Sequence, residues 1–332
     1  MAQTLRLGFV GAGGMAKAHT DALKSMPDVE IAAFTDVRKS AAEEIAAQFN
    51  AQVFDTPEDL VADASVDAVY ILLPPFAHGD AERAALAANL PFFVEKPVGL
   101  DLGLSRELAA EVERAGLLTG AGYMNRYRQG INAVRDMLQA DPAIMAYGGW
   151  WGGSPGPSGG GGIGSWWADK SKSGGQMHEQ VTHTVDLVRY LFGDAEEVFA
   201  YAANGFNKDI PGYSIDDAAT VAIRFKNGGI ANLMSSVSSN AGGGVMLHVH
   251  SLHANFKFTG WEHSVTIQTK GEPEQQIKGE DNIFGIEDAV FLEAVRTKNP
   301  ALVKSDYPDA VKTLAISLAA NESLATGKPV AV

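Results

Sequence analysis

The sequence predicts an α/β protein of two domains: a doubly wound, parallel Rossmann sheet, followed by an α/β domain with a large, mostly antiparallel sheet. Three observations predict this fold. Strand-like runs alternate with helical patterns as far as residue 122. A glycine-rich turn joins the first strand to the first helix. Six strand-like runs then follow residue 193. A chain of 332 residues suits two domains, which we place at 1–122 and 123–332.

Composition narrows the classes of function. The chain is 46% hydrophobic, so it can bury a sizeable core. Its net charge of −14 argues against nucleic acid as a partner, because a phosphate-binding surface needs an excess of basic residues. It has no cysteine, which excludes disulfides, thiolate metal sites and thiol nucleophiles. No apolar run approaches the ~20 residues of a membrane helix, and the N-terminus is not a signal peptide. We therefore expect a cytoplasmic protein with no membrane partner.

The first element is a buried strand at residues 5–10 that runs into a glycine-rich turn. A helix follows, so the pattern G-x-G-x-x-A lies directly between a strand and a helix. The first glycine allows the tight turn, and the second lets backbone N–H groups approach a pyrophosphate at the helix N-terminus. A small third residue lets the helix pack closely on the strand. The turn predicts a dinucleotide site formed by Gly11, Gly13, Gly14, Met15 and Ala16.

The second strand, expected at residues 30–35, ends in Asp36. Rossmann domains place a carboxylate at about this distance from the glycine turn, where it binds the ribose hydroxyls of the adenosine. Such a carboxylate favours NAD, because it would repel the 2′-phosphate of NADP. Arg38 and Lys39 follow at once and could instead pair with that phosphate. We therefore expect NAD, with NADP as the alternative and Arg38 as a further cofactor contact.

Four more strands complete the predicted sheet, at residues 52–54, 68–73, 91–94 and 117–121. Thr56 starts a short helix between them, and Asp101 caps a longer helix that runs to about residue 115. Ligands of doubly wound sheets bind at the carboxyl ends of the strands. The residues at these strand ends are therefore further candidate cofactor contacts: Leu73, Pro74, His78, Glu95 and Lys96.

A helix is expected between the glycines at 174 and 193. Its apolar residues recur at helical spacing, and Glu179 and His183 lie four apart, so both side chains can point the same way. A carboxylate that orients a histidine is a common arrangement for acid–base catalysis. The alternative is a core helix whose polar side chains are merely capped or solvated. Asp186, on the same helix, is expected to have a structural role and not a catalytic one.

Four of the five tryptophans flank the glycine-rich loop at residues 152–164. Aromatic faces suit the C–H faces of sugar rings, so Trp150, Trp151 and Trp167 are candidate substrate contacts and the loop a candidate flap. The alternative is that one tryptophan of each pair packs in the core. Tyr123 and Asn125, at the end of the sixth strand, are either pocket residues or part of the domain junction.

Seven strands are expected in the second domain, at residues 143–153, 197–203, 218–225, 230–238, 245–251, 254–259 and 265–269. Two helices follow at 289–296 and 308–325. Such a sheet would carry helices on one face and leave the other for a second subunit, as a homodimer or homotetramer. His248 and His250 share a strand face, but carboxylates are few nearby, so we expect no metal site. His178 and His183 are five apart, not the four of a zinc-binding H-E-x-x-H helix.

Taken together, these motifs resemble the Gfo/Idh/MocA family of oxidoreductases, which includes glucose-fructose oxidoreductase and inositol dehydrogenase. The matching segments are the turn at 11–16, Asp36, the strand end at 72–75 with His78, Glu95-Lys96-Pro97, the turn at 122–126 and the 174–193 helix. The resemblance implies transfer of hydride between a nicotinamide cofactor and a hydroxyl of a sugar, polyol or inositol, without a metal.

The resemblance also implies roles for single residues. Lys96 corresponds to the lysine near the reacting hydroxyl and His183 to the histidine that transfers its proton. The usual helix motif is D-x-G-x-H, whereas here Glu179 replaces the aspartate and Val181 the glycine. This departure concerns the substrate pose and the proton route. Two alternatives stay open: a glycosidase or lyase assisted by tightly bound NAD, and a non-catalytic sensor that binds the dinucleotide.

Overall fold

The computed structural model describes residues 4–62, 65–153 and 166–332. Contacts divide the chain into two compact units. The first unit comprises Met1–Met124 and Asn282–Val311, and the second comprises Asn125–Asp281 and Lys312–Val332. This division differs from the expected boundary after residue 122 mainly by the segment 282–311. The candidate flap at 152–164 falls almost entirely outside the described residues.

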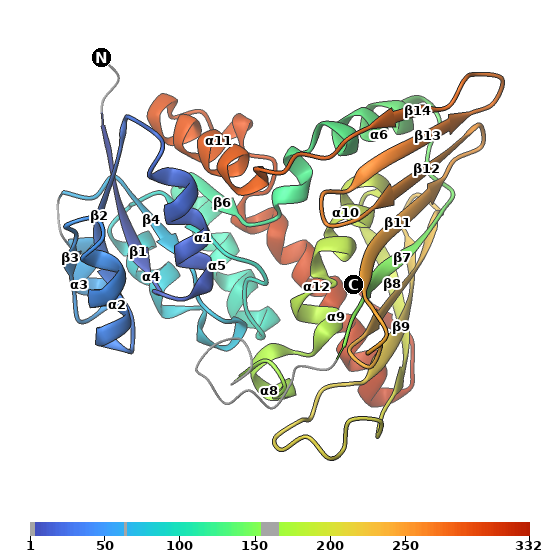
Figure 1. Cartoon of the computed structure of the whole chain (residues 1–332), viewed down its shortest axis with the longest axis horizontal. Helices are drawn as coiled ribbons and strands as arrows, with labels where there is room; N and C mark the ends of the chain where they lie inside the picture. The colour runs from blue at the N-terminus through green and yellow to red at the C-terminus, as the bar shows by residue number, and fades with distance from the viewer. Residues whose placement is uncertain (1–3, 63–64, 154–165) are drawn as a thin grey trace. The chain divides into compact units, whose positions relative to one another are not determined.

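The sheet of the first unit has six parallel strands in the order β3-β2-β1-β4-β5-β6 (Figure 1). The central strand β1 has β2 on one side and β4 on the other, so the order reverses there, as in a Rossmann fold. The expected doubly wound sheet is therefore confirmed. The strands are β1 (Leu5–Val10), β2 (Val29–Thr35), β3 (Gln52–Val53), β4 (Ala68–Ile71), β5 (Phe92–Val94) and β6 (Thr119–Ala121).

Helices alternate with these strands, and stacked aromatic rings join them in the core. Phe9, Phe34, Tyr70 and Phe93 stack with ring centroids 5.0–5.2 Å apart. Burial of each large side chain contributes about 1.5–3 kcal/mol, so this row is a main stabiliser of the unit. The helices are α1 (Gly14–Leu23), α2 (Lys39–Ala46), α3 (Pro57–Ala62), α4 (Asp80–Ala87), α5 (Leu102–Ala115) and α11 (Ile283–Thr297), with 3-10 turns η1 (Pro75–Ala77) and η3 (Pro300–Leu302).

The segment 282–311 joins the first unit through β6 and the aromatic core. The N–H of Ala121 donates to the carbonyl of Ser305 at 2.8 Å, and the N–H of Tyr307 donates to Thr119 Oγ1 at 3.0 Å. Phe291 of α11 packs edge-on against Phe93 at 5.5 Å. These contacts join residues about 190 positions apart. Sequence periodicity could therefore predict helix α11, but not that it belongs to the first unit.

The sheet of the second unit has nine strands, in the order β14-β13-β12-β11-β7-β10-β9-β8-β15. All neighbours are antiparallel except β7 and β10, which pair parallel, so the expected mostly antiparallel sheet is confirmed. The strands are β7 (Met145–Trp151), β8 (Ala195–Ala203), β9 (Ala218–Phe225), β10 (Ile230–Ser236), β11 (Gly244–His250), β12 (Ala254–Thr259), β13 (Ser264–Thr269), β14 (Gln275–Ile277) and β15 (Val330–Ala331).

Buried and exposed residues alternate along these strands, as a sheet covered on one face requires. The buried face contacts α6 (Gln129–Ala140), α9 (Gln176–Glu179) and α10 (Thr182–Phe192) (Figure 1). The other face exposes apolar side chains, including Met145, Tyr147 and Tyr201. The described residues also form α8 (Lys170–Ser173) and α12 (Tyr307–Thr326). The first residues of α12 belong to the first unit. Helix α6 was not predicted from the sequence.

The single helix expected between 174 and 193 is wrong, because the chain forms two helices there. The N–H groups of Gln180 and Val181 both donate to the carbonyl of Gln176, each at 3.0 Å, and Thr184 N–H donates to Val181 at 2.8 Å. A bond that spans five residues and one that spans three thus interrupt the regular spacing of four at Val181. The β-branched Val181 and Thr182, both fully buried, lie at this junction. Glu179 and His183 consequently lie on different helices.

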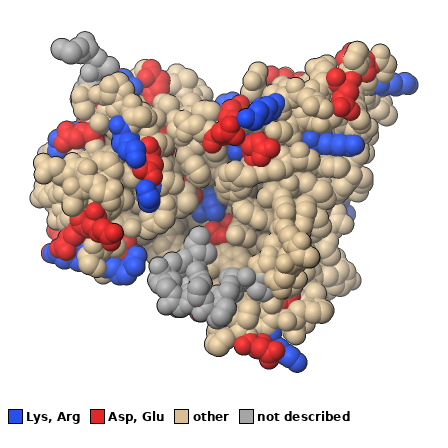
Figure 2. Space-filling view, viewed as in Figure 1, with Lys and Arg blue, Asp and Glu red and all other residues tan. Residues whose placement is uncertain are grey.

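Acidic and basic side chains are interspersed over the face seen in Figure 2, with wide areas of other residues between them. The described residues on that face form no large patch of one charge. Within the described residues, no helix is both long and apolar enough to cross a membrane.

Candidate active site

The glycine-rich turn between β1 and α1 has the shape that a dinucleotide requires. Gly11 has a φ of +100°, and a Cβ there would lie 2.4 Å from the carbonyl oxygen of Leu72. Only glycine fits this position. At Gly13 and Gly14 an added Cβ would meet nothing within 4 Å, so the turn is open on that side. Gly13 also caps α1 without a side chain, which leaves the helix N-terminus open to an anion.

Asp36 is fixed beside this turn by two backbone groups. Its Oδ2 accepts a hydrogen bond from the N–H of Ala12, and its Oδ1 accepts one from the N–H of Arg38, each at 2.8 Å. The guanidinium of Arg38 is exposed, with its Nε 3.9 Å from the carboxylate. Ala16 is fully buried, which allows α1 to pack closely on the sheet. These residues fit a dinucleotide whose ribose hydroxyls meet a carboxylate.

His78 lies within the fold at the end of β4. Its Nδ1 lies 2.6 Å from Glu82 Oε1, and its Nε2 lies 3.2 Å from the carbonyl oxygen of Leu73. The other oxygen of Glu82 accepts the N–H of Gly79 at 2.7 Å, where α4 begins. Burial alone would raise the pKa of Glu82, but the neighbouring His78 and the Gly79 N–H lower it. His78 thus holds the start of α4, while Leu73 and Pro74 are half-buried at the strand end.

Glu95 and Lys96, at the end of β5, belong to a buried network. One oxygen of Glu95 lies 3.2 Å from His19 Nε2, and the other accepts the N–H of Lys96 at 3.0 Å. His19 Nδ1 lies 2.8 Å from Asp288 Oδ1 of α11. Burial would lower the pKa of His19, but the two carboxylates outweigh it and raise that pKa well above 6.5. The network fixes the backbone from which the Lys96 side chain projects.

Tyr123 and Asn125, at the end of β6, are both almost fully buried. Asn125 Oδ1 accepts a hydrogen bond from Arg128 Nε at 2.7 Å. Asn125 therefore fixes the buried guanidinium of Arg128, three residues later in the chain.

Glu179, at the end of α9, is held by a tryptophan. Trp167 Nε1 donates to Glu179 Oε2 at 2.9 Å. The Trp167 indole is 3% exposed and packs with Ile215 and Val237, so it is a core residue rather than an open surface. The ring N–H of Trp167 thus binds the candidate catalytic residue Glu179 at the end of α9.

His183 lies in the first turn of α10 and is 6% exposed. Its ring meets the indole of Trp261 edge to face, with centroids 6.1 Å apart and planes at 84°. The Trp261 indole also meets Trp150, at 5.4 Å and 63°. Two indoles and the imidazole thus form one aromatic group in the second unit. His178, by contrast, lies 3.0 Å from Ser317 through its Nδ1, so the two histidines face different neighbours.

Asp186 has the structural surroundings that the sequence predicted. Its two oxygens accept hydrogen bonds from Arg126 Nε at 2.8 Å and Nη2 at 2.5 Å, and Thr313 Oγ1 donates to it at 2.9 Å. Both ionic side chains are at most 3% exposed. A buried bidentate pair of this kind ties α10 to the turn after β6 and to α12.

The remaining predicted aromatic and histidine residues lie in the sheet. Trp151 is half-buried against β11, since a Cβ on Gly244 would lie 2.7 Å from its indole. His248 Nδ1 lies 2.7 Å from the hydroxyl of Tyr147, and His250 Nδ1 lies 2.5 Å from Asn255 Oδ1. These histidines are engaged with the sheet, as expected. In the ranges that the structure describes, no three potential ligands group into a metal site.

Two residues that contact the candidate site were not singled out from the sequence: His19, beside Glu95, and Trp261, beside His183. His19 is a polar residue on the buried face of α1, and Trp261 is a large aromatic in a tight turn between β12 and β13, where small polar residues are usual. Both are local anomalies that could have been found. Their contacts with Asp288 and His183 could not have been found, because these contacts join distant parts of the chain.

Comparison with known proteins agrees with this architecture. Residues 5–123 match the oxidoreductase family with an NAD-binding Rossmann fold, and residues 144–257 match the GFO/IDH/MocA C-terminal domain. The chain is 25% identical to myo-inositol 2-dehydrogenase of Thermotoga maritima, over 70% of this chain and 68% of that protein. It is also 25% identical to scyllo-inositol 2-dehydrogenase (NAD(+)) of Bacillus subtilis, over 99% and 97%.

A solved structure of levoglucosan dehydrogenase in complex with NADH superposes with a TM-score of 0.86. It covers 99% of each chain at 18% identity, which supports the fold. The open glycine turn, the fixed Asp36 and the two family matches lead to one conclusion: this chain belongs to the Gfo/Idh/MocA family of oxidoreductases and carries its NAD-binding Rossmann domain.

Proposed function

We propose that this oxidoreductase converts a hydroxyl of a sugar, inositol or other polyol into a ketone, and the reverse, with NAD as the redox partner. The observation that carries the proposal is the retention of Lys96 at the end of β5 and His183 on α10 in a chain with an intact dinucleotide turn. Its relatives include dehydrogenases named for inositols and for glucose 6-phosphate.

His183 is proposed to accept the proton of the reacting hydroxyl. A histidine imidazole can serve as such a base, and positioned acid–base groups typically contribute ~10²–10⁴-fold. The ammonium of Lys96 is proposed to donate a hydrogen bond to the same oxygen and to stabilise the negative charge that develops on it. Bound NAD would supply the hydride acceptor. Glu179 would orient His183 or hold another hydroxyl of the substrate.

Cofactor binding is proposed for the remaining strand-end residues. Gly11, Gly13 and Gly14 would let the pyrophosphate approach the first turn of α1, with Met15 and Ala16 beside it. Asp36 would accept hydrogen bonds from the ribose hydroxyls, and this carboxylate disfavours a 2′-phosphate. Leu73, Pro74, His78 and Glu95 would form or support the same side of the cofactor site. Trp150 and Trp151 stay proposed substrate contacts, whereas the buried Tyr123, Asn125 and Trp167 would act on the substrate side only through packing.

The second unit is proposed to bind substrate and to join subunits. The helix-free face of its sheet exposes Met145, Tyr147, Tyr201, Ile230 and Met234. Apolar residues on one sheet face often mark an interface, so we propose a homodimer or homotetramer that acts in the cytoplasm. Light scattering after size exclusion would measure the mass, and a monomer at micromolar concentration would refute the assembly.

The activity is tested by following NADH absorbance with a panel of inositols, aldoses and linear polyols. Wild type should reduce NAD with at least one of them, whereas Lys96→Ala and His183→Ala should lose about 10²-fold or more in kcat. Release of free sugar from glycosides without net NADH would instead indicate a redox-assisted glycosidase or lyase. NAD binding without turnover across the panel would indicate a sensor. Near-wild-type turnover in either variant would refute the role assigned to that residue.

A further inference from the structure

We propose that Trp261 is a substrate-contacting residue, which places the face of its indole against the C–H face of a ring-shaped polyol. The inference rests on the proposed function and narrows its substrate class from polyols in general to pyranoses and cyclohexane polyols. It follows from how Trp261 is held, from what its indole touches and from how much of it is exposed.

The backbone of Trp261 is fixed by two donors. Its carbonyl oxygen accepts a hydrogen bond from Arg128 Nη2 at 3.1 Å and another from His263 Nδ1 at 3.0 Å. Both lone pairs of the carbonyl are therefore used. Burial lowers the pKa of His263 to about 4, so this imidazole is neutral near pH 7. Because a carbonyl oxygen can only accept, the single N–H of the neutral ring lies on Nδ1.

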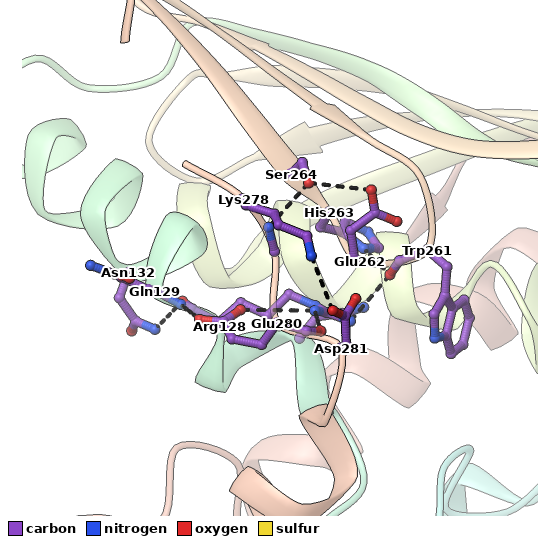
Figure 3. Close-up of polar contacts among 12 residues, drawn as sticks. Arg128, Gln129, Asn132, Trp261, Glu262, His263, Ser264, Lys278, Glu280 and Asp281 are labelled. Carbon is purple, nitrogen blue, oxygen red and sulfur yellow. Dashed lines mark hydrogen bonds and ion pairs between the residues drawn. The ribbon is translucent and has the colours of Figure 1, made fainter. Parts of the chain in front are cut away.

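Arg128 is itself fully buried, so its position is fixed in turn. Its Nη1 donates to the carbonyl of Glu280 at 2.7 Å, and its Nε donates to Asn125 at 2.7 Å. The same guanidinium thus joins the start of α6, the turn between β12 and β13, and the segment after β14 (Figure 3). An element anchored in this way resembles a preorganised binding site more than a mobile surface turn.

This anchoring involves only the backbone carbonyl of Trp261, not its indole. In Figure 3 it extends away from Arg128, and Trp261 is 44% exposed although it contacts His183 and Trp150. A large aromatic that is rigidly held, partly exposed and in contact with the proposed base has the features of a ligand platform. The same ring is thus both partly exposed and in contact with the imidazole that would take the proton.

The chemistry of an indole face selects among polyols. A ring-shaped polyol whose hydroxyls are equatorial presents several axial C–H bonds on one flat face, which can lie on the indole. A linear polyol must lose the freedom of its rotatable bonds to present a comparable face. The chain is therefore expected to prefer a cyclic substrate over a linear one with a similar number of hydroxyls.

The test compares Trp261→Ala, Trp261→Phe and Leu252→Ala with wild type. Leu252 is a matched control, because it is an exposed apolar residue in the hairpin turn at the opposite end of β12. Steady-state kinetics would use myo-inositol, glucose and sorbitol with NAD. Binding of the same three polyols would be measured separately by calorimetry on His183→Asn, with and without Trp261→Ala, in the presence of NADH.

Trp261→Ala should lower kcat/KM for the best cyclic substrate by about 10- to 100-fold, mainly through KM, and should change the linear polyol about threefold or less. Trp261→Phe should recover most of the loss, and Leu252→Ala should resemble wild type. If kcat/KM of Trp261→Ala for the cyclic substrate lies within about twofold of wild type, the proposal for Trp261 is overturned. The proposed roles of Lys96 and His183 would not be affected, because they are tested by their own variants. If wild type turns over none of the inositols, aldoses and linear polyols of the wider panel, the proposed function fails. Trp261 is then judged by calorimetry alone, and unchanged or absent binding of the cyclic polyols overturns its proposed role.

Discussion

His19 Nδ1 lies 2.8 Å from Asp288 Oδ1, and both side chains are fully buried in the first unit. A buried imidazole between this carboxylate and Glu95 is stabilised in its charged form, which raises its pKa well above 6.5. A group whose pKa is raised on folding contributes stability that is complete below its unfolded pKa and is lost as the pH rises through its folded pKa. The network is therefore a source of pH-dependent stability.

We predict that His19→Asn lowers the free energy of unfolding by about 3–5 kcal/mol near pH 6, because it leaves buried carboxylates without their cation. The difference between wild type and variant should decrease as the pH rises above 6.5. Urea denaturation at about pH 6 and about pH 9 measures it, and subtraction of the variant removes the titration of the groups outside the His19–Glu95–Asp288 network. A difference that is constant or grows with pH would show that His19 is neutral in the folded protein.

The glycine turn predicts two opposite phenotypes for similar substitutions. Gly11→Ala should destabilise the protein by about 1–3 kcal/mol, because of its φ of +100° and the 2.4 Å approach to Leu72. Gly13→Ala has open space and should cost about 1 kcal/mol or less in stability, yet it should weaken NAD binding about tenfold or more. Thermal unfolding and NADH fluorescence titration separate the two effects. Unchanged NADH affinity in Gly13→Ala would contradict the placement of the pyrophosphate.

The order of elements in the first unit could be predicted well from the sequence. Buried parallel strands appear as continuous apolar runs, and the glycine turn has a fixed place between strand and helix, so β1 and Asp36 were located directly. Helix α5 was also predicted with its cap, since Asp101 accepts a hydrogen bond from the N–H of Leu104. These features depend on neighbours in the chain, where propensity and pattern agree.

Features that depend on distant contacts could not be predicted. The break between α9 and α10 is hidden in an apolar pattern that suits one continuous helix, and packing around Val181 decides it. Helix α6 was missed although Ile131, Val134 and Leu138 recur at helical spacing on its buried face. The position of the Trp261 backbone depends on Arg128, 133 positions earlier in the chain. Spacing identifies residue types, whereas such tertiary partners decide their use.

The hydrogen bond between Trp167 and Glu179 predicts an energetic coupling. Trp167→Phe keeps a buried ring but removes the N–H that donates to Glu179 Oε2 at 2.9 Å. This variant and Glu179→Gln should each lower kcat/KM, by about tenfold, and the double variant should lose less than the sum of the two free energies. The coupling should be about 0.5–3 kcal/mol in a double-mutant cycle. Strict additivity would mean that Trp167 acts only through packing.

Asp186 is predicted to stabilise the second unit rather than to catalyse. Asp186→Asn leaves the buried Arg126 without its carboxylate and should lower the free energy of unfolding by about 3–5 kcal/mol. Thr313→Val, which removes one hydroxyl hydrogen bond to the same carboxylate but leaves its ion pair with Arg126, should cost less, about 1.5–3 kcal/mol. Below the unfolding transition, both variants should keep kcat within about threefold of wild type. A 10²-fold loss of kcat in folded Asp186→Asn would give the residue a catalytic role.

The central claim is that hydride passes between a polyol carbon and NAD while His183 takes the hydroxyl proton and Lys96 stabilises the oxygen. The most direct measurement is single-turnover transfer from myo-inositol carrying deuterium on its ring carbons, with the recovered NADH analysed by mass spectrometry. Wild type should yield NADH one mass unit heavier from the labelled substrate, and His183→Asn should slow its formation about 10²-fold or more at neutral pH. NADH without the label, or an unslowed His183→Asn, would contradict the account.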